Sequence, residues 1–271
     1  MKKILVINDL ASIGHTSLNV NIPILSACGY DVIPLVTTTL SRHTAYKNAL
    51  RVDINDSFER IINNFIENND TFNCILIGYL ANANQIDLII PLLKNNPHAY
   101  VVLDPVCADN GKFYQGMNQD YALQLRKLFP YINLLLPNVT ESLALTNHPL
   151  STKYSLDSIE LSINELNQLA KTDIVISGLV VKKQIQCAIY EQGTISTCHT
   201  SYINAYVPGT GDAFASLIVA KLLVGHSLNE SVAYAMQLIY DTIINLINTQ
   251  YDLMQGMPVP QLLKQLVNDF K

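Results

Sequence analysis

Short apolar runs alternate along this chain with longer segments in which apolar residues recur every three or four positions. The runs at 4–7 and 74–78 have the continuous apolar character of strands buried on both faces of a sheet. The segments 57–68, with Ser57 as a candidate N-cap, and 156–170 have the pattern of amphipathic helices. Further strands are expected at 31–36, 100–103, 133–136 and 174–177, and further helices at 16–28, 85–94, 119–128, 213–224, 228–248, 259–270 and from about 140.

This alternation of strand and helix predicts an α/β fold with a central, mostly parallel, doubly wound sheet and helices on both of its faces. Two later segments, 186–191 and 194–199, have the pattern of an antiparallel hairpin joined around Gln192-Gly193. The sequence contains no repeat, low-complexity tract or linker, so we expect one domain over residues 1–271.

Composition and charge limit the kinds of molecule that this protein is expected to bind. The chain is 49% hydrophobic and 14% charged with a mean hydropathy of +0.20, which suits a sizeable core. A net charge of −5 argues against nucleic acid or an anionic membrane as partner, and no apolar run is long enough to span a bilayer. The apolar start breaks at Asn8-Asp9, which favours the first strand of a cytoplasmic protein over a signal peptide. The five cysteines form no C-x-x-C pair and are expected to be reduced.

The strongest chemical signal is the turn formed by Gly209, Thr210, Gly211 and Asp212, which is followed at once by an apolar helical pattern. Glycines allow a sharp turn that gathers backbone N–H groups, and a helix N-terminus adds its own, so the turn predicts an anion hole. A carboxylate at the mouth of that hole suits phosphoryl transfer, in which it receives the proton of the acceptor. The alternative is an ordinary capped helix in which Asp212 binds the first-turn amides.

Ligands of open α/β sheets bind beyond the carboxyl ends of the strands. Three acidic residues, Asp104, Glu141 and Asp212, are expected to meet there, and a magnesium–nucleotide complex would relieve their repulsion. Each has a structural alternative: Asp104 can simply end a strand, and Asn138 with Glu141 can form a capping box. The candidates at the expected strand ends are Asp9, 37–44, Tyr79, Asp104, Asn138, Glu141, Ser177 and Gly178.

These residues resemble a known pattern. The Gly209–Asp212 turn resembles the G-x-G-D signature of the ribokinase-like superfamily, and 136–141 resembles its P-N-x-x-E motif. Within that superfamily, the stretch 104–114 is similar to the D-P-V-M-G-D-x-G-x-x-Y stretch of the pyridoxal/pyridoxamine (vitamin B6) kinases. The segment 41–44 resembles their S-N-H-T loop and 78–80 their G-Y-L, so the resemblance covers nearly the whole chain.

The resemblance implies ATP-dependent phosphorylation of the 5′-hydroxymethyl group of pyridoxal, pyridoxine or pyridoxamine, in salvage of pyridoxal phosphate. It implies ATP and Mg²⁺ as cofactors, with a monovalent cation such as K⁺ left open, and a homodimer. It makes Asp212 the base, and the amides of Gly209, Thr210 and Gly211 the anion hole. The resemblance also assigns residues to three binding roles. The substrate is expected to contact Asp9, Ser41, Thr44, Tyr79 and Asp212. The nucleotide is expected to contact Asp104, Asn138, Glu141, Ser177, Gly209 and Gly211, and the metal ion Asp104 and Glu141.

The resemblance is incomplete at three places. Asp9 stands where many vitamin B6 kinases have serine, and a carboxylate there favours a cationic substrate. Cys107 replaces the usual methionine, either as a packing substitution or as a thiol that adds reversibly to an aldehyde. Ser177-Gly178 falls where some relatives carry a lysine near the nucleotide.

Two rival functions remain open at this point. Hydroxymethylpyrimidine kinase shares the fold and the mechanism, and a non-catalytic nucleotide-binding protein would share the fold alone. The polar segment 37–46 is expected to form a lid over the substrate rather than an ordinary surface loop.

Overall fold

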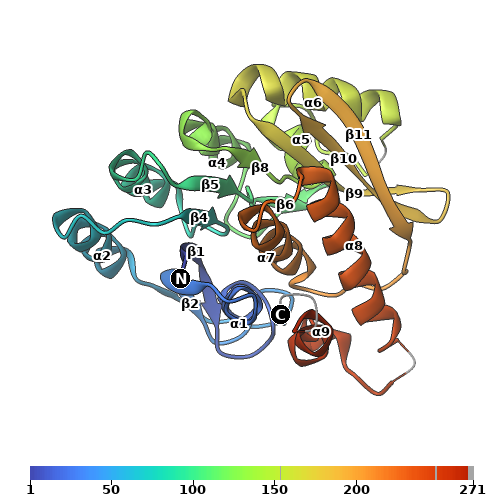
Figure 1. The fold of residues 1–271 in the computed structure, drawn as a ribbon, viewed down its shortest axis with the longest axis horizontal. Coiled ribbons are helices and arrows are strands. Elements are labelled where there is room, and N and C mark those ends of the chain that lie inside the picture. Colours follow the sequence, from blue (N-terminus) through green and yellow to red (C-terminus); the bar gives the residue numbers. More distant parts are fainter. Residues whose placement is uncertain (153, 248, 268–271) are drawn as a thin grey trace.

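A computed structural model describes residues 1–152, 154–247 and 249–267, and within them a nine-stranded sheet forms the centre of the molecule (Figure 1). Its strand order is β11-β10-β9-β8-β5-β4-β1-β2-β3. The six strands from β9 to β2 in this order are parallel, whereas β3 at one edge and the β10–β11 hairpin at the other are antiparallel. The strands span β1 Lys3–Ala11, β2 Asp31–Leu40, β3 Arg51–Asp53, β4 Cys74–Ile77, β5 Tyr100–Leu103, β8 Leu134–Leu135, β9 Asp173–Val181, β10 Gln184–Glu191 and β11 Thr194–Ser201, and a separate small hairpin pairs β6 Ala108–Asp109 with β7 Lys112–Phe113.

Helices cover both faces of the sheet, as the sequence predicts (Figure 1). Helices α2 to α6 pack on one face, and α1, α7, α8 and α9 pack on the other. The α-helices span α1 Leu18–Ala27, α2 Asn55–Glu67, α3 Ala83–Asn95, α4 Gln119–Leu125, α5 Val139–Leu145, α6 Leu156–Ala170, α7 Thr210–Leu223, α8 Leu228–Ile244 and α9 Val259–Leu266, with 3₁₀ turns η1 Arg126–Tyr131 and η2 Leu253–Gln255.

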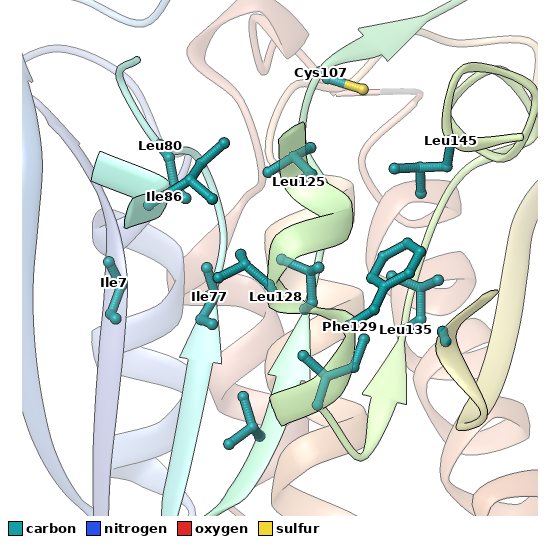
Figure 2. Close-up of a cluster of buried hydrophobic side chains, with 14 of the residues drawn as sticks. Ile7, Ile77, Leu80, Ile86, Cys107, Leu125, Leu128, Phe129, Leu135 and Leu145 are labelled. Carbon is teal, nitrogen blue, oxygen red and sulfur yellow. The ribbon is translucent and has the colours of Figure 1, made fainter. Parts of the chain in front are cut away.

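The apolar runs of the sequence supply both cores because successive side chains of a strand point to opposite faces. Along β1, Leu5 and Ile7 belong to the cluster under α2 to α6, whereas Ile4 and Val6 belong to the cluster under α1 and α7 to α9. Figure 2 shows part of the first cluster, in which the η1 residue Phe129 lies among side chains from neighbouring strands. A strand that is buried on both sides leaves only its ends free for chemistry.

The predicted elements are present, but several of their bounds differ. Strands β1 and β9 continue to Ala11 and Val181, so Asp9, Ser177 and Gly178 lie within strands and not at their predicted ends. Strand β2 continues to Leu40, so the polar segment expected as a lid begins as a strand. Ser57 does not cap α2, because the helix already begins at Asn55, after Ile54. The helix expected at 119–128 changes to a 3₁₀ turn after Leu125. Helix α8 ends at Ile244, and residues 248 and 268–270 of the expected helices lie outside the described part of the chain. Among the described helices, none is both long and apolar enough to cross a membrane.

Candidate active site

A cavity of about 540 Å³ opens at the carboxyl ends of the parallel strands. The expected lid contributes His43, Thr44 and Ala45 to its wall. Ser41 does not line it, because its side-chain oxygen accepts a hydrogen bond from the Leu50 backbone N–H and thereby closes the β2–β3 turn. The other predicted site residues all line the cavity: Asp9, Thr44, Tyr79, Asp104, Asn138, Glu141, Ser177, Gly209, Thr210, Gly211 and Asp212.

The two glycines of the central turn, Gly209 and Gly211, differ in backbone conformation and in the space around their Cα atoms. Gly209 has φ +83° and precedes the first residue of α7, and a Cβ added there would lie 2.3 Å from the backbone oxygen of His15. A side chain is therefore excluded by both the left-handed backbone and the close approach of another loop. Gly211 is different: it lies in the first turn of α7, and a Cβ there would meet only an oxygen of Asp104, 4.0 Å away.

The Asp212 carboxylate takes hydrogen bonds from outside its own helix, in addition to one from its own backbone N–H in the first turn. Its Oδ2 accepts a hydrogen bond from the Ser17 backbone N–H at 2.8 Å, and its Oδ1 accepts one from the Asn8 side-chain amide at 3.0 Å. Ser17 makes its bond from a backbone with φ 53°, which is uncommon for serine. Burial raises the pKa of Asp212, and the hydrogen bonds from Ser17 and Asn8 oppose that shift. Two segments far away in the sequence thus hold the carboxylate in place.

Asp104 lies beside the first turn of α7, where a Cβ added at Gly211 would be 4.0 Å from its Oδ2. Burial, and secondarily the negative charge of Asp212, raise the pKa of Asp104 to about 8. Glu141 is also buried, and burial together with the charge of Asp104 raises its pKa well above the ordinary value. The three acidic residues therefore form one electrostatically coupled group, as the sequence predicts.

Asn138 and Glu141 also form the capping box that was the structural alternative. The Glu141 carboxylate accepts hydrogen bonds from the backbone N–H groups of Asn138, at 2.8 Å, and of Cys107, at 3.1 Å. The Asn138 side chain accepts from the Glu141 N–H and donates to the Ala108 carbonyl. The box thus fixes the start of α5 while both residues line the cavity. Asn138 and Glu141 can therefore both stabilise the helix and contact a ligand.

The family model described as phosphomethylpyrimidine kinase matches residues 24–256 of this chain. The chain belongs to that family. It is 30% identical to a crystallised pyridoxal kinase from Lactobacillus plantarum, with a TM-score of 0.92 and coverage of 99% of this chain and 97% of that one. It is 30% identical, with a TM-score of 0.92 and coverage of 98% and 95%, to a Bacteroides thetaiotaomicron protein crystallised with pyridoxal.

A curated relative, the pyridoxal kinase PdxY of Haemophilus influenzae, is 26% identical over 79% of this chain and 81% of its own length. These likenesses confirm the resemblance to the ribokinase-like superfamily that the motifs indicated, and they confirm the α/β fold with its late antiparallel hairpin.

Asp9, on β1, contributes a carboxyl group to the wall of the cavity. It is buried, and the hydroxyl of Ser17 donates a hydrogen bond to its carboxylate. Burial raises the pKa of Asp9 to about 7, and the charge of Asp212 acts in the same direction. Tyr79, also in the wall, receives a hydrogen bond from Arg51 on β3. The part of the cavity wall that the sequence predicts to bind the substrate therefore includes a buried carboxyl group with a raised pKa.

Sequence reasoning missed the apolar part of the cavity. Strand β10 contributes Ile185 and Cys187 there, and α8 contributes Met236, Ile239 and Ile243. The excess of apolar residues in 228–248 could have indicated this wall, but a core helix has the same pattern. Asn8 and Ser17, which hold Asp212, were also missed, because their role depends on a contact across about 200 positions.

Cys107 is fully buried and does not line the cavity. Its side chain belongs to the core under α2 to α6 (Figure 2). Addition of this thiol to an aldehyde in the cavity conflicts with that position, so the packing substitution is the better interpretation. Burial also raises the pKa of the Cys107 thiol, which keeps it in its unreactive protonated form.

Replacing Asp104 with asparagine is expected to stabilise the ligand-free protein, increasingly so as pH rises. The pKa of Asp104 is about 8 in the folded state and near 4 when unfolded, so its ionisation opposes folding progressively from about pH 4 to 8. Asparagine removes that cost, and we expect the gain in melting temperature to be larger at pH 8 than at pH 5. Thermal unfolding across this range tests it, with the exposed Asp87→Asn as the control. A gain that does not change with pH would contradict the assignment.

Proposed function

We propose that this chain is an ATP-dependent pyridoxal kinase, which phosphorylates the 5′-hydroxymethyl group of a vitamin B6 vitamer. The observation that carries the proposal is the position of the Asp212 carboxylate, held by Ser17 and Asn8 at the first turn of α7. Gly209 to Gly211 directly precede it, and Asp104 lies near Gly211 in the wall of the same cavity. Its relatives from Lactobacillus plantarum and Haemophilus influenzae are named pyridoxal kinases, which supports the same reading.

The geometry suits an in-line transfer. The hydroxymethyl oxygen of the substrate forms a new bond to the γ-phosphorus, the bond from phosphorus to the bridging oxygen of ADP breaks, and the hydroxyl proton passes to Asp212. Because the transition state of phosphoryl transfer is loose, this proton moves late and a modest base is sufficient. The backbone N–H groups at the start of α7 would stabilise the charge on the transferred group.

The acidic cluster fits a magnesium ion. Asp104 and Glu141 offer carboxylate oxygens, which are the ligands Mg²⁺ prefers, and burial makes their charges costly without a cation. Within the described residues there is no group of three or more His, Cys, Asp or Glu side chains arranged to hold a metal by themselves. This agrees with an ion that takes most of its ligands from phosphates and water, and that neutralises charge during transfer. A requirement for K⁺ stays a prediction.

One assay tests the proposal against its rivals. The protein is supplied with MgATP and, in turn, pyridoxal, pyridoxine, pyridoxamine and hydroxymethylpyrimidine, and kcat/KM is compared. We expect the highest value for one of the three vitamers. The highest value for hydroxymethylpyrimidine would favour the thiamine-precursor kinase instead, and absence of ATP consumption with all four would favour a non-catalytic nucleotide-binding protein.

Asp9 is expected to favour a cationic vitamer. Replacing it with serine should lower kcat/KM for pyridoxamine about tenfold more than for pyridoxal, because a charged hydrogen-bonding partner of the amine is lost. In the wild type this preference should grow as pH rises through about 7, where Asp9 ionises. The measurement is the ratio of the two kcat/KM values between pH 6 and 8, with the exposed Asp53→Ser as the control. An equal fall for both vitamers would refute this role.

The homodimer and the cytoplasmic location expected from the sequence stay predictions. Light scattering of the purified protein tests the first, and fractionation of the source cells tests the second.

A further inference from the structure

Ser17 has a backbone conformation that serine rarely adopts. Its φ is 53° and its ψ is −129°, a combination that is crowded for any residue with a Cβ and is common only for glycine. A backbone of this kind opposes folding and persists only where the surrounding structure enforces it, most often at functional sites. Ser17 lines the cavity, and its N–H donates to Asp212, so the strain lies beside the proposed base.

The chain is fixed on both sides of Ser17. The preceding His15 carbonyl lies between two glycines, because a Cβ added at Gly209 or Gly256 would be 2.3 or 2.4 Å from its oxygen. The Cα of Thr16 would be 3.2 Å from the same added Cβ of Gly209. Helix α1 begins directly after Ser17. The change of direction between the fixed loop and the helix therefore falls on Ser17.

The side chain of Ser17 supplies a further restraint. Its hydroxyl donates a hydrogen bond to the Asp9 carboxylate instead of capping α1, which is the usual role of serine before a helix. This bond lowers the pKa of Asp9, against the larger effect of burial. A hydrogen bond to a carboxylate is stronger than one between neutral groups, so it can offset the cost of the strained backbone. Glycine would have no strain to offset, but it has no hydroxyl to donate.

We propose that the Ser17–Asp9 hydrogen bond holds the Ser17 backbone in its strained conformation and thereby positions the Asp212 carboxylate. This inference rests on the proposed function. Ser17 then connects two buried carboxyl groups, through its hydroxyl to Asp9 and through its N–H to Asp212 Oδ2 at 2.8 Å. Ser17 and Asp9 act on the reaction through Asp212, as positioning residues, and Asp9 has this role in addition to its proposed contact with the substrate.

The variants Ser17→Ala and Ser17→Gly separate the hydroxyl from the backbone. Both remove the hydroxyl, but only glycine adopts this φ and ψ without strain. In Ser17→Ala the loop can relax away from Asp212, so we expect kcat at saturating pyridoxine to fall about 30-fold. In Ser17→Gly the N–H keeps its place, and we expect a fall of about threefold. KM for ATP should be unchanged in both, and Ser17→Gly should melt about 4 °C above Ser17→Ala.

The matched control is Lys171, which also has a positive φ, 52°, but is exposed at the end of α6 and does not line this cavity. Lys171→Gly should melt above Lys171→Ala, whereas kcat should equal that of the wild type in both. The proposal is overturned if Ser17→Ala keeps the kcat of the wild type, or if Ser17→Gly loses as much kcat as Ser17→Ala. If the wild type phosphorylates none of the vitamers, the proposed function fails instead, and this outcome is read from the wild type alone.

Replacing Asp9 with alanine tests the other end of the hydrogen bond, and it tests the proposal even if Ser17→Ala does not fold. With saturating pyridoxine, which has no amino group, Asp9→Ala should lower kcat about 30-fold, because the hydroxyl of Ser17 loses its acceptor. In a Ser17→Gly background the backbone needs no restraint, so the same replacement should lower kcat no more than about threefold. An equal fall in both backgrounds would show that Asp9 does not act through Ser17 and would overturn the proposal.

Discussion

Replacing Asp212 with asparagine is expected to lower kcat by about 10²- to 10⁴-fold while the dissociation constant for ATP stays close to that of the wild type. Asparagine keeps the size of the side chain and its oxygen can still accept the hydrogen bond from the Ser17 N–H, whereas its NH2 group would face the Asn8 amide, so that hydrogen bond is lost. What it loses is the ability to take the proton of the hydroxymethyl group. Most of the remaining acceleration would come from alignment and from the backbone amides at the start of α7.

The Asp212→Asn measurement combines single-turnover phosphorylation with a direct titration of ATP binding. Asp87→Asn serves as the control, because Asp87 lies on α3 in an exposed ion pair with Lys127. Turnover close to that of the wild type would show that Asp212 is not the base. Loss of ATP binding together with turnover would show instead that the substitution disturbs the nucleotide side of the cavity.

The parts of the fold that could be predicted are those whose cause is local. The strands β4 and β5 are short apolar runs with both faces buried, and such runs are visible in any sequence. Strand β3 and the β6–β7 hairpin were missed, because strands of two or three residues are too short to carry a comparable pattern.

The residues of the candidate site also fall into those that local sequence predicts and those that depend on the tertiary fold. Asp104 and Asp212 could be predicted because each follows or begins an element that the pattern defines. The partners of Asp212 could not be predicted, since Asn8 and Ser17 reach it only through the tertiary fold. Glu141 shows a further limit: its sequence context is equally that of a capping box and of an active-site residue, and the structure shows the box and a place in the cavity wall together.

The two glycines of the central turn are expected to fail in different ways when each is replaced with alanine. Gly209→Ala should destabilise the protein by about 3 kcal/mol, because it combines a left-handed backbone with a Cβ 2.3 Å from the His15 backbone oxygen. Its loss of activity would follow from unfolding or from displacement of the loop that bears Thr16. At Gly209 the added methyl group would meet the protein backbone before it could reach a ligand in the cavity.

Gly211→Ala should fold normally, because its only neighbour within 4 Å is an oxygen of Asp104 at that limit and alanine favours the helix. The methyl group would point toward the Asp104 carboxylate in the cavity wall, where we expect the transferred phosphoryl group to lie, so we expect kcat to fall about 100-fold. Thermal unfolding and kcat measured on both variants separate the two effects. A Gly211→Ala protein with full activity would mean that the phosphoryl group does not pass beside Gly211 and Asp104. The anion hole at the start of α7 would then have to be sought on the Thr210 side of the turn.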